Sequence, residues 1–150
     1  MVSHRFEKEK QILEIKFKKA KYKIYLNLIG KIQVKNILMA IIAANNSGIE
    51  FKKILKILPR IKSVKGRLEK IGKIHNNSKV ILDYAHTPAA LESALSNLKE
   101  QFPFNKINLI FGCGGDRDFK KRSLMGKIAE KYSNEIYLTD DNPRNEKPFK

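Results

Sequence analysis

Three short stretches of the chain contain residue types that bind charged small molecules. The first runs from Gly112 to Asp118 and has the sequence Gly-Cys-Gly-Gly-Asp-Arg-Asp. Its glycines let the backbone turn tightly and approach a ligand closely. Asp116 and Arg117 add charges at the mouth of this loop. Taken alone, the loop fits a binding site and an ordinary strand-to-helix turn with solvated charges equally well.

The second stretch has the sequence Asp-Asp-Asn-Pro-Arg and ends at Arg144. Arg117 and Arg144 offer planar forks that suit a carboxylate or a phosphate. Asn142 supplies a donor and an acceptor, and Asp141 can accept from an ammonium group. Together these groups suit a zwitterionic amino acid with a second polar end. The alternative is a plain turn in which Pro143 fixes φ and Asp141 caps, but a turn does not account for Arg144.

The third stretch, Asp83-Tyr-Ala-His86, follows a short apolar segment. The Asp83 carboxylate suits a ribose hydroxyl or Mg²⁺-bound phosphates. For His86 alone, a local hydrogen bond at a helix N-terminus is the favoured interpretation. The sequence has no Ser-His-Asp order, no Cys-His pair, no metal-ligand cluster and no Gly-x-x-x-x-Gly-Lys-Ser/Thr loop. We therefore assign no catalytic residue and no metal site.

The elements around these stretches alternate between strand and helix. Apolar runs predict strands, and apolar residues at helical spacing predict helices. Right-handed crossovers would make the three strands parallel and bring all three loops to one edge, where ligands bind. The sequence therefore predicts an α/β fold whose C-terminal half is a Rossmann-like parallel β-α-β-α-β sheet. The predicted elements are strands 79–82, 107–111 and 135–139 and helices 88–102 and 123–132.

The N-terminal half shows a different pattern. Loose alternation predicts a strand pair, 11–17 with 22–28. Two helices, about 34–45 and 51–58, and an extended segment follow. A polar break at 76–78 coincides with a shift in composition. We therefore predict two domains, residues 1–77 and 78–150.

The net charge of +16 is concentrated in the first half of the chain. Residues 1–79 hold 20 Lys/Arg and 5 Asp/Glu, whereas residues 80–150 hold 11 and 10. A basic half can bind nucleic acid, and a nucleic-acid-binding module is the alternative function. Because 25 of the 31 basic residues are lysine, a solvated lysine-rich surface is favoured, and no nucleic-acid partner is expected.

Composition also indicates the compartment. No apolar run approaches the ~20 residues needed to span a bilayer, so no membrane partner is expected. Charged residues rather than an apolar segment follow Met1, so no export signal is expected. The single cysteine, Cys113, fits a reducing environment. We therefore expect a cytoplasmic protein.

Four motifs of the second half carry a family resemblance: Asp83-Tyr-Ala-His-Thr-Pro88, Phe111-Gly-Cys-Gly-Gly-Asp-Arg-Asp118, Lys121-Arg-Ser-Leu-Met-Gly126 and Thr139-Asp-Asp-Asn-Pro-Arg144. They closely resemble the Mur ligases, most of all those of the MurE type. The resemblance covers about residues 28–150, and Gly66-Arg67-Leu68-Glu69 is similar to the end of the family's central ATPase domain.

The resemblance implies an ATP-dependent, amide-bond-forming ligase of peptidoglycan precursor synthesis. Such a ligase adds meso-diaminopimelate to UDP-N-acetylmuramoyl-L-alanyl-D-glutamate and uses ATP and Mg²⁺. The family's UDP-binding domain, its P-loop and its carbamylated lysine would precede Met1. We therefore expect a fragment that is inactive alone: the end of the central domain and the first half of the C-terminal domain. An amino-acid-binding module without chemistry of its own is a third hypothesis.

The resemblance also implies two sets of site residues. The chain departs from the family pattern at one position near Asn36, where Gln33 replaces the usual asparagine. The set that would bind meso-diaminopimelate is Arg117, Asp141, Asn142, Pro143 and Arg144. The set on the ATP side is Asn36, Arg67, Asp83 and His86.

Overall fold

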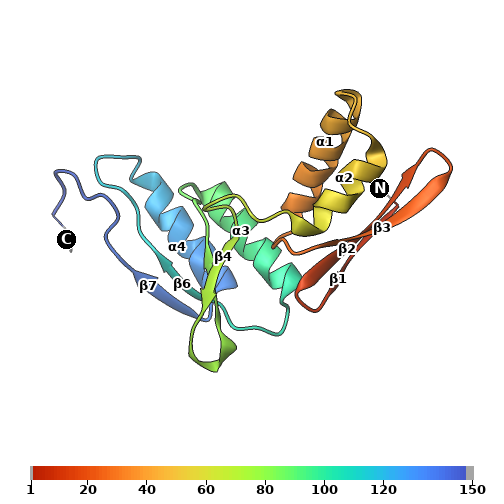
Figure 1. Ribbon diagram of the computed structural model, residues 1–150. Coiled ribbons are helices and arrows are strands. Elements are labelled where there is room, and N and C mark those ends of the chain that lie inside the picture. Colours follow the sequence, from red (N-terminus) through yellow and green to blue (C-terminus); the bar gives the residue numbers. More distant parts are fainter. Residues whose placement is uncertain (1, 148–150) are drawn as a thin grey trace. The chain divides into compact units, whose positions relative to one another are not determined.

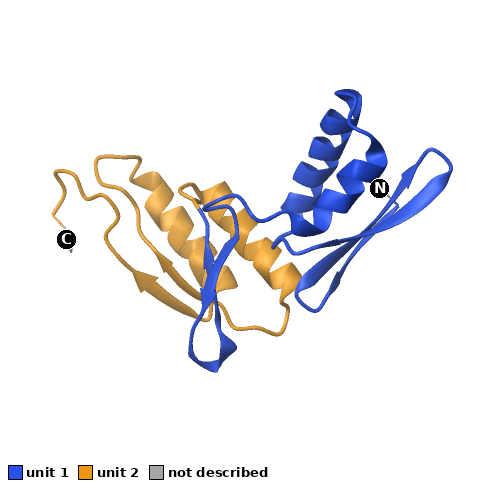
Figure 2. Ribbon diagram, viewed as in Figure 1, with its two compact units in different colours: residues 1–83 blue, residues 84–150 orange. Residues whose placement is uncertain are grey.

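A computed structural model describes residues 2–147, and the elements follow one another as shown in Figure 1. The chain divides into two compact units, residues 1–83 and 84–150 (Figure 2). Each unit has its own cluster of buried apolar side chains. The division into domains 1–77 and 78–150 stays a prediction.

Unit 1 begins with a three-stranded antiparallel sheet in the order β1-β2-β3. The strands are β1 (Ser3–Glu7), β2 (Lys10–Phe17) and β3 (Ala20–Leu26). The β2–β3 pair confirms the predicted hairpin, with Leu13 opposite Ile24. Strand β1 was missed because its sequence, Ser-His-Arg-Phe-Glu, lacks the apolar alternation that marks a strand.

Two helices follow the sheet, as predicted: α1 (Ile32–Asn46) and α2 (Phe51–Ile57), which continues into the short 3₁₀ helix η1 (Leu58–Arg60). Their buried side chains pack with the inward face of the sheet. The Phe17 and Phe51 rings stack with centroids 4.0 Å apart, which fixes the start of α2 against the β2–β3 hairpin. The core of unit 1 consists of Leu13, Ile15, Ile24, Leu26, Leu28, Val34, Ile37, Ile41, Phe51, Ile54 and Leu58.

A buried glutamine ties the sheet to the start of α1. Gln11 is fully shielded from solvent. Its Nε2 donates to the carbonyl oxygens of Leu28 at 2.8 Å and Gly30 at 3.0 Å, and its Oε1 pairs with Nε2 of His4 at 2.8 Å. Because the polar atoms of this side chain are paired, burying it carries little desolvation penalty.

Unit 1 ends in a second, smaller sheet. Strand β4 (Glu69–Lys73) pairs antiparallel with β5 (Lys79–Leu82), across a short connection that contains the 3₁₀ helix η2 (His75–Asn77). Asn76 and Asn77 both have positive φ, a conformation that asparagine adopts more readily than most residues. They therefore allow the chain to reverse within a few residues.

Unit 2 contains α3 (Pro88–Gln101), β6 (Asn108–Phe111), α4 (Lys120–Tyr132) and β7 (Glu135–Leu138). Strands β6 and β7 pair in parallel, as predicted. Thr87 caps α3 by accepting the N–H of Ala90 at 3.3 Å, and Pro88 occupies the first turn. Buried Leu91, Leu95 and Met125 join the two helices to the inward side of β6.

One part of the predicted fold was wrong. The chain is α/β, but the described residues contain no three-stranded parallel sheet, because β5 pairs with β4 and the parallel sheet holds only β6 and β7. The extended segment before β5 had not been assigned as a strand. Its closeness in sequence explains the pairing, because a short hairpin connection loses less entropy on closing than a long crossover.

Candidate functional site

Two loops of unit 2 meet at the carboxyl ends of β6 and β7. We call residues 112–118 the glycine loop and residues 139–146 the arginine loop. The N–H of Thr139 donates to the carbonyl oxygen of Phe111 at 3.1 Å, and the N–H of Gly115 donates to that of Asn142 at 2.8 Å. Of the three loops that were predicted to converge, these two therefore meet.

The glycines allow this approach because they lack side chains. A Cβ at Gly112 would overlap the carbonyl oxygen of Thr139, and a Cβ at Gly115 would overlap that of Pro143. Neither obstacle is a flexible side chain that could move aside. Glycine at these two positions is therefore a requirement of the loop-to-loop contact.

Arg144 lies at the centre of this contact. Its guanidinium donates to the carbonyl oxygen of Gly115, and its N–H donates to Oδ1 of Asn142 at 3.3 Å. Its backbone has φ of 50°, a left-handed conformation that is uncommon for arginine. The side chain is exposed and aimed back toward the glycine loop. Arg117 lies in the glycine loop itself and is also exposed.

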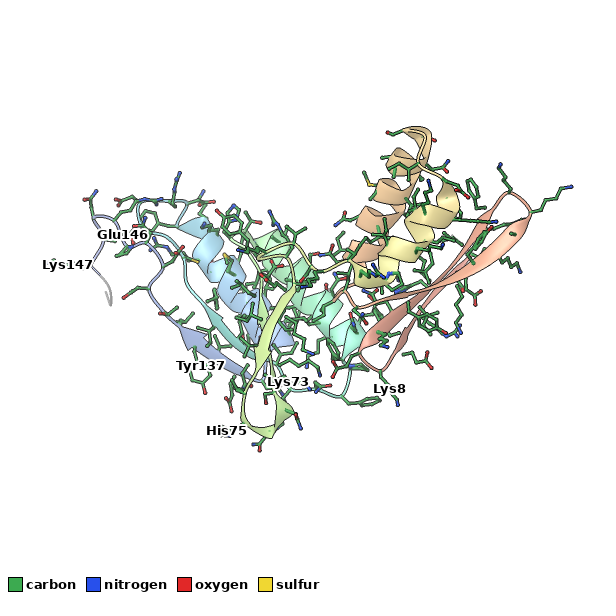
Figure 3. The ribbon with its side chains drawn as sticks, in the orientation of Figure 1. Lys8, Lys73, His75, Tyr137, Glu146 and Lys147 are labelled. Carbon is green, nitrogen blue, oxygen red and sulfur yellow. The ribbon has the colours of Figure 1, made fainter. Side chains whose placement is uncertain are left out.

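A third arginine, Arg122, which was not predicted as a site residue, joins the same loops. Arg122 of α4 forms two contacts with the carboxylate of Glu146, at 2.8 and 2.9 Å, and a third with the carbonyl oxygen of Gly114 at 3.3 Å. Its guanidinium lies 4.4 Å from the centre of the Phe119 ring. Figure 3 labels Glu146 in the segment that follows β7. In the sequence, Arg122 lies in the third of the four motifs that resemble the family, Lys121 to Gly126.

Two acidic residues complete the connection between the loops. Glu146 accepts the N–H of Asp116 at 2.6 Å. The Asp116 carboxylate accepts from both the backbone and the side-chain nitrogens of Asn145, at 3.2 and 2.9 Å. The hydrogen bond from Arg122 lowers the pKa of Glu146, and the bond from the Asp116 N–H acts in the same direction.

A cleft of about 690 Å³ opens beside the two loops. Its wall combines apolar side chains with charged groups, as ligand sites commonly do. Of the residues predicted to bind diaminopimelate, Asp141 and Pro143 line it. The lining also includes Phe111, Phe119, Arg122, Leu138, Asp140 and Glu146.

His86 makes the local contact that its own sequence context favoured. Its Nδ1 lies 3.1 Å from the carbonyl oxygen of Tyr84. In addition, Lys121 Nζ donates to the carbonyl oxygen of His86 at 3.1 Å. The His86 turn is therefore attached to the first turn of α4.

The other predicted ATP-side residues gather in unit 1. Asn36 donates to Oε1 of Gln33 at 3.1 Å, and Gln33 donates to the carbonyl oxygen of Arg67 at 3.3 Å. The N–H of the next residue, Leu68, donates to the Asp83 carboxylate at 2.9 Å. Gln33, the departure from the family pattern, is thus the link that joins Asn36 to Arg67.

The described residues do not form a metal centre. Within residues 2–147, no group of three or more His, Cys, Asp and Glu side chains is arranged to hold an ion. The described residues therefore provide no complete set of protein ligands for an ion such as Mg²⁺. In the same part, no helix is both long and apolar enough to cross a membrane.

Together, the parallel strand pair, the helices that cover it and the paired loops at its carboxyl edge define an α/β fold, and this edge is where such folds usually bind ligands. Comparison with known proteins gives the family. Residues 66–150 match the family described as Mur ligase, glutamate ligase domain. The chain belongs to the Mur ligase family.

Individual relatives agree with this assignment. The UDP-N-acetylmuramoyl-L-alanyl-D-glutamate–2,6-diaminopimelate ligase of Rickettsia felis is 46% identical over 123 residues, covering 81% of this chain and 22% of that protein. The ligase of the same name from Buchnera aphidicola subsp. Baizongia pistaciae is 50% identical over 123 residues, covering 82% and 24%. The chain thus spans about a quarter of the length of these curated relatives.

Solved structures match the fold over nearly the whole chain. A UDP-N-acetylmuramoyl-L-alanyl-D-glutamate–2,6-diaminopimelate ligase superposes with a TM-score of 0.68 at 32% identity, covering 97% of this chain and 29% of that one. The UDP-N-acetylmuramate–alanine ligase MurC from Thermotoga maritima has a TM-score of 0.70 at 22% identity, covering 93% and 36%. The second likeness concerns the fold alone.

Proposed function

We propose that the chain is part of an ATP-dependent ligase that adds meso-diaminopimelate to UDP-N-acetylmuramoyl-L-alanyl-D-glutamate in peptidoglycan precursor synthesis. Residues 1–77 would end its ATP-binding domain, and residues 78–150 would begin its amino-acid-binding domain. The observation that carries the proposal is the contact of the arginine loop with the glycine loop, because it gathers charged groups suited to an amino acid. Similarity to the Rickettsia felis and Buchnera ligases supports the reaction and the substrates.

In this reaction ATP supplies the phosphoryl group that activates the D-glutamate carboxylate as an acyl phosphate. An amino group of diaminopimelate attacks the activated carbon, a C–N bond forms, the C–O bond to phosphate breaks and the nitrogen loses a proton. The residues of this chain would hold the attacking amino acid in place. Such positioning accelerates a reaction by removing the need for a chance encounter in the right orientation.

The arginine loop supplies groups for each end of the amino acid. One N–H of the Arg144 guanidinium is used by the carbonyl of Gly115, and an arginine side chain has five N–H donors. The others would bind a carboxylate, while Asp141 would accept from an ammonium group. Asn142 would add polar contacts, Pro143 would stiffen the loop, and exposed Arg117 would bind the second carboxylate.

On the ATP side, Asn36 would lie near adenine, and Arg67 and Asp83 near ribose or phosphate. Gln33 links Asn36 to Arg67, and Asp83 accepts the N–H of the next residue, Leu68, which supports a shared role of the three in one unit. His86 is a weaker member of this set, because its ring is already engaged with its own turn. The Mg²⁺ ion would be held by parts of the longer ligase, since the described residues offer no cluster for it.

Titration of the 150-residue chain with meso-diaminopimelate and with L-lysine tests this proposal. We expect weak but selective NMR shifts in both loops with meso-diaminopimelate only, because lysine lacks the second carboxylate. Arg144→Ala should abolish them, whereas Arg60→Ala, an exposed arginine in unit 1, should not. Equal responses to both amino acids would contradict the proposal.

Two further assays separate this proposal from its alternatives. We expect no ligase turnover by the chain alone with ATP and the UDP-dipeptide, and measurable turnover would refute the view that it is part of a longer ligase. The nucleic-acid-binding alternative requires strongly salt-dependent binding of DNA or RNA. We expect none near physiological salt.

A further inference from the structure

We infer that Arg122 and Glu146 are positioning residues that hold the Arg144 guanidinium in the orientation that receives the amino acid's carboxylate. This inference rests on the proposed function, because it concerns the same amino-acid site. Neither residue belongs to the set that the family resemblance implied. Both lie in unit 2, on α4 and at the end of the arginine loop.

The first step of the argument is the geometry of the pair. Two nitrogens of Arg122 contact two oxygens of Glu146, at 2.8 and 2.9 Å, so the pair is a bidentate fork that fixes both planes. The side chains are 33% and 26% exposed, which makes them half-shielded rather than free on the surface. Phe119 lies against the Arg122 guanidinium and restricts it further.

The second step is that the pair joins three segments of backbone. Arg122 also donates to the carbonyl oxygen of Gly114, and Glu146 also accepts the N–H of Asp116. The residue between them, Gly115, provides the carbonyl that receives the Arg144 guanidinium. The pair therefore holds the backbone on both sides of the acceptor on which Arg144 depends.

The third step concerns what the pair contributes besides stability. A partly exposed ion pair contributes little to the stability of a fold. In this pair, Nε of Arg122 is shielded and has no partner among the described residues, an arrangement that costs stability. The arrangement of Arg122 and Glu146 is thus better explained by the way it holds the neighbouring loops than by any contribution of the pair to the stability of the fold.

The test reads the Arg144 side chain directly by NMR of its Nε–Hε group, with Arg144→Lys used to assign the signal. We expect a signal displaced from the free-arginine position in the wild-type chain and a return to that position in Arg122→Gln and Glu146→Ala. Arg122→Lys keeps the charge without the fork and should give an intermediate shift. The control is Lys131→Gln, which breaks the exposed pair between Lys131 of the same helix, α4, and Glu92 of α3 and should change nothing.

The backbone amide of core residue Leu95 reports whether each variant folds. An Arg144 signal that stays displaced in both Arg122→Gln and Glu146→Ala, with Leu95 unchanged, would overturn the inference, as would a free-arginine position in the wild-type chain. Because this readout needs no ligand, it is independent of the proposed function. If the chain does not respond to meso-diaminopimelate, that result counts against the proposed function. Whether Arg122 and Glu146 position Arg144 is then still decided by the Arg144 signal.

Discussion

Gly115 donates its N–H to the carbonyl oxygen of Asn142 and receives the Arg144 guanidinium on its own carbonyl oxygen. One glycine in the glycine loop is therefore bonded twice to the arginine loop. These hydrogen bonds join residues almost 30 positions apart in the sequence into one loop-to-loop contact, and the side chains proposed to bind the amino acid project from this contact.

Substituting Gly115 should disrupt the contact between the glycine loop and the arginine loop. In Gly115→Ala the new methyl group would overlap the Pro143 backbone, so we expect a loss of about 1–3 kcal/mol in unfolding free energy. Gly126→Ala is the matched control, because nothing lies within 4 Å of its Cβ position and alanine favours a helix interior by about 1 kcal/mol. Urea unfolding monitored by circular dichroism measures both. A destabilised Gly126→Ala and a neutral Gly115→Ala would contradict this prediction.

Acid should release the Glu146 end of the arginine loop. Because contacts lower the pKa of Glu146, its contribution to stability is fully present above the ordinary glutamate value of about 4.3 and is lost as pH falls through the lowered value. The amide signal of Asp116, which donates to Glu146, should therefore titrate with a midpoint below about 4.3. NMR measurement of this signal from neutral pH into acid gives the midpoint.

Two variants test the cause of this titration. Arg122→Gln removes the largest source of the lowered pKa, so the midpoint should move up toward the ordinary value. Glu146→Gln removes the titrating group, so its curve should lose this transition. A wild-type midpoint at or above the ordinary glutamate value would show that the pair does not hold the carboxylate in its charged form.

Asp83 should control the conformation of Leu68 in unit 1. Leu68 is 3% exposed, has φ of 46°, and donates its N–H to the Asp83 carboxylate. In Asp83→Ala this buried N–H loses that acceptor, which should destabilise the unit by about 1–3 kcal/mol. Asp83→Asn retains an acceptor oxygen and should stay close to the wild-type chain. Hydrogen exchange at the Leu68 amide distinguishes them, and equal exchange in both variants would count against the assigned contact.

The sequence was most informative where a local rule applied. Alternation and helical spacing predicted the β2–β3 hairpin and both helices of unit 2, and the Thr87-Pro88 pair predicted the start of α3. Strand pairing was harder, because β5 has an apolar sequence that suits either a parallel or an antiparallel partner. Proximity along the chain favours pairing with β4, and that effect leaves no mark on the sequence of β5 itself.

In the candidate site, too, local sequence rules predicted some features and missed others. Glycine, arginine and asparagine in two post-strand loops were enough to predict that these loops meet. Arg122 and Glu146 could not be found in this way. Arg122 lies on α4, Glu146 follows the Asp-Asn-Pro-Arg sequence, and the two become partners only when α4 and the arginine loop fold together. No rule of sequence spacing pairs a glutamate with an arginine 24 positions away.

Strand β7 has a further consequence for the purified chain. It pairs only with β6 in the described part of the chain, all four of its residues are exposed, and Leu138 is 74% exposed. Figure 3 shows Tyr137 on this strand, and the register places it beside exposed Ile110. An apolar edge with unpaired backbone groups is a template on which another chain can add a strand. At high concentration, self-association through β7 should therefore limit the solubility of the protein before unfolding does.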